Sequence, residues 1–278
     1  ALPAGGTPLT SADLGADVTR AGTLRVGGEI TSGGLDPVRT ITSTDGDLIV
    51  DGTLRSADLG AARQALVLRA PGGTVFITGT VDTSGEDGLH DGNAGGGLVI
   101  EAARVVIGGQ LPAAGEQGVL GAAGGTGGDL RVVASAGSIW LGHGTLVTAG
   151  GSSMSRGGDA GGIELRATGP LWLAGIIDSF GGDARNVATA EGGRGGPITI
   201  VGGSTLDLTS TVRLRGGAAT GADATATGGA AGILTIDAVG LTRIGGVVDG
   251  RGGIASGGVT GGTVNAGAAG SVRIGDQT

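Results

Sequence analysis

Residues 162–182 read GIELRATGPLWLAGIIDSFGG, and this stretch decides the fold. Its apolar residues come in three short groups separated by glycines, namely Ile163/Leu165, Leu171/Leu173 and Ile176/Ile177. The first two groups alternate with a period of two, which is the pattern of a β-strand, and none is long enough for an ordinary helix. The stretch therefore predicts three very short strands with tight corners, followed by a long glycine-rich loop.

The middle strand of this stretch recurs along the chain as an apolar-x-apolar triplet. The copies are Leu24/Val26, Leu48/Val50, Val75/Ile77, Val105/Ile107, Ile139/Leu141, Leu171/Leu173, Leu206/Leu208, the weaker Thr242/Ile244, and Val272/Ile274. In most copies another apolar residue follows six residues after the first residue of the triplet. In the fifth copy this residue is shifted to Leu146 or Val147. From the third copy on, a further strand precedes the middle one, as Leu66/Leu68, Leu98/Ile100, Leu130/Val132, Ile163/Leu165, Ile198/Ile200 and Leu234/Ile236.

Repeats of this length indicate a solenoid, a propeller or a tandem array. A propeller blade needs four longer antiparallel strands, whereas these corners are too short to reverse a strand. We therefore predict an all-β, single-stranded parallel β-solenoid of about eight to nine coils. Each coil carries three short strands and a long loop, and parallel crossovers favour a right-handed coil. The solenoid spans 22–278, and 1–21 is an N-terminal extension that serves as a cap or an inter-subunit strand.

The composition limits what the chain can do. It has 67 glycines in 278 residues, no cysteine and a net charge of −8. The negative charge and scattered arginines argue against nucleic acid, and no apolar run reaches membrane-spanning length. Regularly placed Val, Ile and Leu argue against disorder in the body. For the long loops at 217–231 and 250–270, order and disorder both stay open.

The residue between the two apolar positions of each middle strand should point outward. Five of these outward positions in succession are apolar: Ile49, Phe76, Val106, Trp140 and Trp172. Such an apolar ladder should not face water in a monomer. Either the long loops or the first 20 residues cover it, or it is a lateral contact with another copy or a sugar-stacking stripe. We take the five residues as interface candidates.

Outward charges on the preceding strands are expected to pair between coils. Arg69 lies one coil from Glu101, and Arg131 lies one coil from Glu164. Opposite charges stacked in this way help to fix the register of neighbouring strands.

Residues suited to catalysis or metal binding do not gather in the sequence. Asp82, Asp178 and Asp249 recur after third strands, but they fall in separate coils and are expected to form turns rather than a catalytic pair. His90 and His143 are isolated. The segment 124–132, GGTGGDLRV, has the wrong phase for a calcium-binding nonapeptide. We predict no enzyme activity, no catalytic residue and no cofactor or metal.

The two ends suggest self-association. The last copy, SVRIGDQT, stops in the middle of a coil, and we see no capping helix in it. Open strand edges template further pairing, so Val272 and Ile274 are also interface candidates. We expect the N-terminal segment of one copy to complete the last coil of the next, which is a heterologous contact that generates filaments.

The repeat of glycine pairs and apolar triplets is similar to that of secreted bacterial, glycine-rich β-solenoid surface proteins such as filamentous haemagglutinin-like adhesins. The resemblance covers about 22–278 and implies secretion and a cell-surface or matrix role. We expect a structural subunit of an extracellular filament or surface matrix that binds copies of itself. An adhesin or carbohydrate-binding solenoid is the alternative, with surface glycans as partners, and a polysaccharide-acting enzyme is the third.

Overall fold

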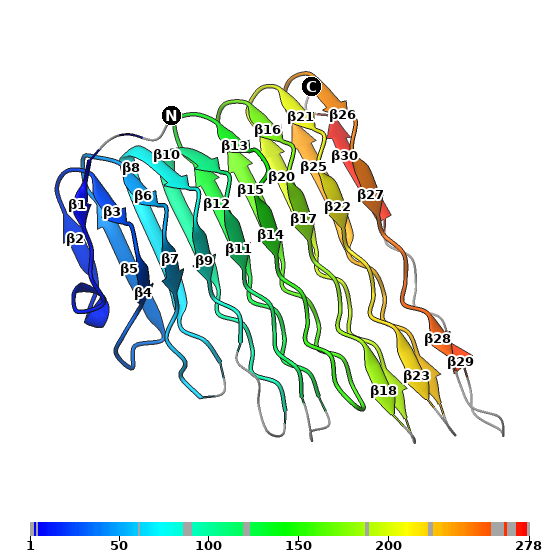
Figure 1. Ribbon diagram of the computed structural model, residues 1–278. Coiled ribbons are helices and arrows are strands. Elements are labelled where there is room, and N and C mark those ends of the chain that lie inside the picture. The colour runs from blue at the N-terminus through cyan, green and yellow to red at the C-terminus, as the bar shows by residue number, and fades with distance from the viewer. Residues whose placement is uncertain are drawn as a thin grey trace.

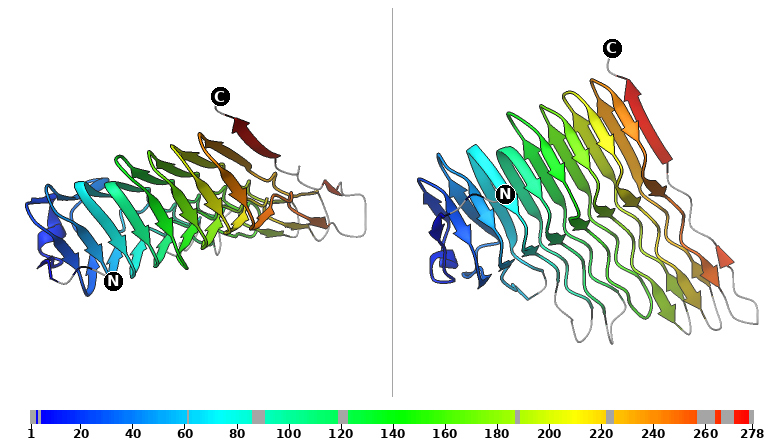
Figure 2. Two further views of the ribbon diagram at one scale, coloured as in Figure 1. Left: turned by 90° about the horizontal axis from the view of Figure 1, so that it is seen from above. Right: turned by 45° about the horizontal axis from the view of Figure 1, so that its top comes forward.

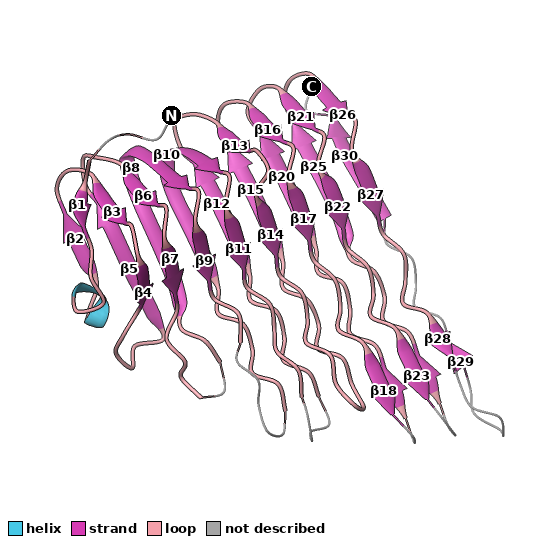
Figure 3. Ribbon diagram, in the orientation of Figure 1, coloured by secondary structure: helices cyan, strands magenta, loops and turns pink. Residues whose placement is uncertain are grey.

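The computed structural model describes residues 3, 5–60, 62–85, 91–118, 123–186, 189–221, 225–256, 264–265 and 271–276. The chain winds into a coil, and each turn adds one strand to each of three stacks (Figures 1 and 3). The pairings between these strands are parallel. The only helix in the described part is one 3-10 turn, η1 (Asp13–Gly15). The protein is an all-β parallel β-solenoid, which confirms the predicted fold.

We call the three stacks the first, middle and third columns. The first column contains β2 (Val18–Arg20), β5 (Val38–Ser43), the start of β8 (Ala65–Ile77), the start of β10 (Leu98–Ile107), β12 (Leu130–Ala134), β15 (Ile163–Ala167), β20 (Ile198–Gly202), β25 (Ile233–Ala238) and β30 (Ser271–Asp276). The middle column contains β1 (Thr7–Pro8), β3 (Leu24–Val26), β6 (Leu48–Val50), the ends of β8 and β10, β13 (Ile139–Leu141), β16 (Leu171–Leu173), β21 (Leu206–Leu208) and β26 (Thr242–Ile244). The third column contains β4 (Glu29–Thr31), β7 (Thr53–Arg55), β9 (Thr80–Asp82), β11 (Gln110–Pro112), β14 (Thr145–Val147), β17 (Ile176–Asp178), β22 (Thr211–Arg213) and β27 (Val247–Asp249).

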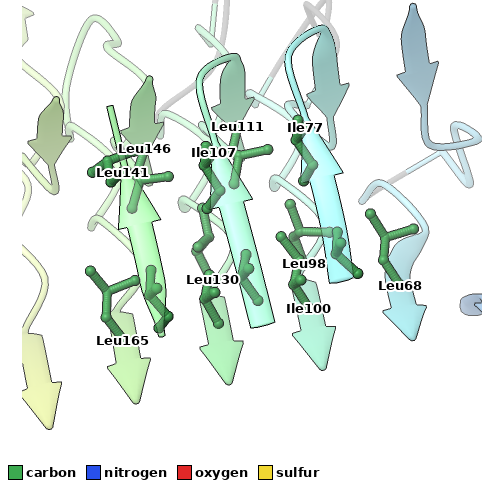
Figure 4. Close-up of a cluster of buried hydrophobic side chains, with 14 of the residues drawn as sticks. Leu68, Ile77, Leu98, Ile100, Ile107, Leu111, Leu130, Leu141, Leu146 and Leu165 are labelled. Carbon is green, nitrogen blue, oxygen red and sulfur yellow. The ribbon is translucent and has the colours of Figure 1, made fainter. Parts of the chain in front are cut away.

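Aliphatic side chains from all three columns form one continuous core. Leu98, Leu130 and Leu111 are buried, and Figure 4 shows such side chains pointing into the space enclosed by the coil. In the fifth copy Leu146 is the buried residue, which resolves the slip seen in the sequence. Each buried Leu or Ile contributes about 1.5–3 kcal/mol relative to exposure, so the repeated aliphatic positions hold successive coils together.

The first column extends further toward both ends than the sequence predicted. Val18 of β2 and Ile41 of β5 are buried there, but Thr, Arg and Ser surround them and hide the apolar pattern. At the other end Val272 pairs with Leu234, so the ninth copy is an opening strand and its assignment to the middle column is wrong. Both columns use the same apolar-x-apolar triplet, and the triplet alone therefore does not identify the column.

The long loops after the third column stack into a flat, two-layered plate, which we call the fin (Figures 1 and 2). Each loop has an outgoing arm and a returning arm. At the tip, the outgoing arms form β18 (Ala184–Asn186), β23 (Ala219–Gly221) and β28 (Ala255–Ser256). The returning arms form β19 (Ala190–Glu191), β24 (Ala226–Thr227) and β29 (Val264–Asn265). Small side chains, Ala184, Ala190, Ala219 and Ala226, fill the space between the layers at the tip.

Backbone hydrogen bonds join the two layers of the fin through glycines. The nitrogen of Gly151 donates to the oxygen of Gly125 at 2.8 Å, and the nitrogen of Gly158 donates to Gly151 at 2.8 Å. Gly182 then donates to Gly158 at 2.9 Å. The same series continues through Gly193, Gly217, Gly229 and Gly253. These hydrogen bonds form a continuous path that runs from coil to coil and holds the two layers together.

The amides of a returning arm point in three directions with a period of three. Gly124 donates to the neighbouring coil, and Gly125 donates across to the other layer; Gly127 and Gly128 repeat this pair of contacts. The third amide faces outward, where an aspartate of the preceding coil accepts it, as Asp129 Oδ1 does for the nitrogen of Gly162 at 2.7 Å. Three residues per turn is the repeat of a polyproline II helix.

Close packing, more than unusual dihedrals, requires glycine in the fin. A Cβ on Gly193 would lie 1.9 Å from the oxygen of Gly158, and one on Gly158 would lie 2.0 Å from that of Gly125. In the described chain, the glycines with positive φ are Gly5, Gly6, Gly22, Gly34 and Gly60, all outside the fin. The loop at 217–231 is hydrogen-bonded in its described residues, which favours the ordered alternative there.

Candidate functional site

The predicted apolar ladder is a continuous row on the outer face of the middle column. Register places Ile49 beside Phe76, Phe76 beside Val106 and Val106 beside Trp140, and Trp172 follows on β16. Burial differs along this row. Ile49 is fully buried, so its role as a surface candidate is wrong, and Phe76 and Val106 are half-buried.

The tryptophan end of the ladder is open to solvent. Trp140 and Trp172 are 44% and 43% exposed and face outward side by side on β13 and β16. The fin leaves the coil after the third column and runs away from this face (Figure 1). The expectation that the long loops cover the ladder is therefore wrong for the two tryptophans.

Beyond Trp172 the row continues into charged residues. Asp207 on β21 is in register with Trp172, and Arg243 on β26 is in register with Asp207. A surface hollow of about 500 Å³ lies here, lined by Thr205, Leu206, Asp207, Leu241, Thr242 and Arg243. The Oδ1 atom of Asp207 is buried and accepts no hydrogen bond, which is unusual because buried polar atoms are normally paired. The sequence placed Asp207 in the outward phase but gave no sign of this unpaired atom.

The predicted charge pairs are confirmed on the first column. Arg69 Nε lies 2.9 Å from Glu101 Oε2, and Arg131 Nε lies 3.0 Å from Glu164 Oε2. Arg131 also reaches Glu101 at 3.3 Å, so the pairs join into one ladder across neighbouring coils. These side chains are partly exposed, and each pair is worth about 0–1 kcal/mol. They fix register more than they add stability.

Arginines pair with the three recurring aspartates of the third column. Asp178 Oδ2 accepts from Arg213 at 3.2 Å, Asp249 pairs with Arg251 at 2.8 Å, and Asp82 lies 3.8 Å from Arg55. Burial raises the pKa of Asp178, although the charges of Arg213 and Arg215 oppose this shift. The Arg251 side chain holds the pKa of Asp249 below its ordinary value.

The remaining candidate residues for chemistry lie apart from one another in the described chain. Among the described residues no three His, Cys, Asp or Glu side chains gather as metal ligands. Asp129, within the calcium-like segment, uses its carboxylate on a backbone amide. His90 lies outside the described residues.

In the described residues, the last strands of the middle and third columns have an unpaired edge beside exposed apolar side chains. Within the described chain, β26 and β27 pair on one side only, with β21 and β22. Leu241, Val247 and Ile244 around these strands are 76%, 63% and 40% exposed. The counterpart of Ile244 in the preceding coil, Leu208, is buried, whereas Thr211, the register partner of Val247, is half-buried, so Val247 lies on the outer side of its strand. Val272 and Ile274 belong to β30, which extends the first column at this end, and their side chains lie outside the described residues.

The N-terminal end is closed by the chain's own first residues. Strand β1 pairs with β3, and Leu9 and Leu14 are buried over the first coil. Thr7 and Leu9 donate their amides toward β3, so Pro8 faces the outer edge, where it lacks an N–H. Proline at a sheet edge discourages further pairing. In the structure the N-terminal segment thus acts as a cap on its own chain.

Polar contacts hold this cap. Asp13 accepts from the amide and the hydroxyl of Thr10 at 2.8 and 2.7 Å and pairs with Arg20. These contacts, led by the Thr10 hydroxyl, lower the pKa of Asp13 to about 2. The cap is therefore fixed by local hydrogen bonds as well as by buried Leu14.

Comparisons with models of protein families, with curated proteins and with solved structures find no match to this chain. In its described residues the protein has no helix with the length and apolar character needed to cross a membrane.

Proposed function

We propose that this chain is a structural subunit of an extracellular filament or surface matrix, in which solenoids join end to end. The observation that carries the proposal is the open C-terminal end, where Leu241, Ile244 and Val247 are exposed beside strands with a free edge. Free edges next to apolar side chains favour strand addition from another chain. A second copy is our choice of partner because its coils have the same three-column cross-section. The extracellular location rests on the resemblance of the repeat to secreted surface solenoids.

The contact would continue the columns from one copy into the next. The terminal strands β30, β26 and β27 belong to the first, middle and third columns, and so do β2, β1 and β4 at the other end. Stacking the two ends coaxially therefore places β2 on β30 and β1 on β26, whereas the third column, with eight strands against nine in the other two, leaves a space of one strand between β27 and β4. Pro8 removes one donor from the middle column, so β2 would supply most of the pairing. This geometry differs from the expected exchange of the N-terminal segment, because β1 stays on its own chain.

The structure sets the repeat of such a filament. The first and middle columns contain nine strands each, which at about 4.8 Å per strand gives a rise of roughly 43 Å per subunit. Because the contact is heterologous and repeats without closure, it generates open polymers. The fin would then run along one side of the filament.

The test places a charge at the open end. In Ile244→Asp/Val247→Asp the carboxylate at 244 would lie between stacked coils, where burying a charge is costly, and the one at 247 would lie at the rim of the contact. Met154→Asp is the matched control, because Met154 is 49% exposed but lies in the fin. We expect wild type and the control to form concentration-dependent oligomers by sedimentation velocity, with linear particles in negative stain. The end variant should remain monomeric with an unchanged circular dichroism spectrum.

Two results would contradict the proposal. One is a wild-type protein that stays monomeric at every concentration up to the millimolar range. The other is an end variant that is folded and still assembles like the control.

A further inference from the structure

We propose that Trp140, Trp172 and the hollow at Asp207 form a binding line for a neutral, linear glycan. This line lies on the outer face of the middle column and is separate from the end-to-end contact. Three features support this assignment: the exposed indole rings, the unpaired carboxylate oxygen of the neighbouring Asp207 and the charge of the surface.

The two indoles are exposed side by side on the outer face of the middle column. They are in register on adjacent strands, so their backbones lie about 4.8 Å apart. A Cβ on Gly142 would lie 2.3 Å from Cη2 of Trp140, which shows that this ring rests on the backbone of the following corner. The glycine therefore lets the ring lie close to the surface. Aromatic faces of this kind bind apolar surfaces while their N–H groups remain available for polar contacts, and sugar rings present apolar C–H faces and polar edges.

The hollow next to Trp172 supplies the polar contacts. Asp207 lines this hollow, and its Oδ1 atom is buried without a donor, so a ligand hydroxyl that displaces the covering atoms would satisfy an atom now left unpaired. Arg243 is the register partner of Asp207, but no ion pair joins them in the structure. Its guanidinium is therefore available to donate to ligand oxygens. An apolar surface with a few polar groups is the usual composition of a small-ligand site.

Length and charge narrow the ligand class. From Trp140 to Arg243 the row crosses three strand spacings, roughly 14 Å, which suits a short stretch of an extended sugar chain. One carboxylate and one guanidinium leave the line without net charge, while the whole chain carries −8 and repels acidic polymers. A second protein copy fits less well, because two indoles offer at most about 500 Å², below the roughly 800 Å² per partner of a stable interface.

Tryptophan fluorescence gives a direct test, because Trp140 and Trp172 are the only two tryptophans. The probes are cellotetraose, xylotetraose and mannotetraose, with tetragalacturonate as the acidic comparator. We expect a saturable change in emission with at least one neutral tetrasaccharide and none with the acidic one. Calorimetry on Trp172→Ala and Asp207→Leu should show at least tenfold weaker binding. Phe180→Ala, an aromatic change at the fin, is the control and should bind normally.

Other outcomes would overturn the inference. One is the absence of a saturable response to every neutral probe up to 10 mM (about −2.7 kcal/mol in binding free energy). Another is unchanged binding by folded Trp172→Ala and Asp207→Leu proteins. Concentration-dependent association abolished by Trp140→Ala/Trp172→Ala, and not by Ile244→Asp/Val247→Asp, would show that a second copy occupies the line instead. Because the end variants leave the tryptophans intact, failure of the filament proposal and failure of this one give different results.

Discussion

Replacing Gly193 by alanine should break the fin locally. The new Cβ would lie 1.9 Å from the oxygen of Gly158, whereas ordinary contacts begin at 3.4 Å, so the arms must separate by about 1.5 Å (3.4 − 1.9). Two hydrogen bonds meet at this residue, from Gly193 to Gly182 at 2.9 Å and from Gly217 to Gly193 at 2.8 Å. Each lost bond costs about 1 kcal/mol, and each buried group left unpaired costs roughly 1–3 kcal/mol. We therefore expect a loss of about 4 kcal/mol of local stability.

The assay compares Gly193→Ala with Gly28→Ala, where a Cβ meets no atom within 4 Å and φ is not positive. The control should be neutral or stabilise by about 0.4–1 kcal/mol, because alanine restricts the unfolded chain. Urea unfolding measures global stability, and hydrogen exchange by mass spectrometry measures opening of the fin alone. If Gly193→Ala matches the control in both measurements, then close approach is not the reason for glycine in the fin.

Two further predictions concern the charged columns. Asp178 has a folded pKa raised above its ordinary 3.8 by burial, so its ionisation opposes folding at neutral pH and the cost disappears below that value. Asp178→Asn should raise the melting temperature at pH 7 more than at pH 3, and an equal change at both pH values would contradict the burial argument. Arg131→Gln removes the partner of Glu101 and Glu164 and should lower the unfolding free energy by less than about 1 kcal/mol, with a smaller effect in 1 M salt. A larger, salt-independent loss in chemical denaturation would show that the ladder does more than fix register.

Strand register could be predicted because burial imposes it. A slip of one residue would turn Leu130 and Val132 outward and separate Arg131 from Glu164, so pattern and charge agree on one alignment. Column identity could not be predicted for β30, because the same triplet serves both columns. Strand β2 escaped notice because one buried valine among polar residues carries little signal.

The fin was the largest feature that sequence reasoning missed, although a signal exists. Glycine pairs recur at a spacing of three before the opening strands, as in GGTGGDL at 124–130 and GGRGGPI at 192–198. In each arm, two of every three residues pack against neighbouring backbone and the third faces outward, and the spacing of the glycine pairs matches this repeat. Glycine abundance alone resembles disorder, so composition concealed the order that the spacing carries.

For the candidate site, alternation predicted the direction of the ladder but not its accessibility. Trp140 and Ile49 share the same phase, yet one is exposed and the other buried. Accessibility depends on what lies against each coil, and such tertiary contacts leave no local pattern. The unpaired oxygen of Asp207 likewise results from three-dimensional packing.

The threefold repeat of the arms restricts how the loops can change in length. Cross-layer amides such as Gly125 and Gly158 each lie five residues before an opening strand, at Leu130 and Ile163. Inserting one or two residues within an arm would rotate these amides away from their acceptors, whereas inserting three would restore every contact one step further out. During evolution the arms should therefore change in length by three residues at a time, whereas the tips of the loops can vary more freely.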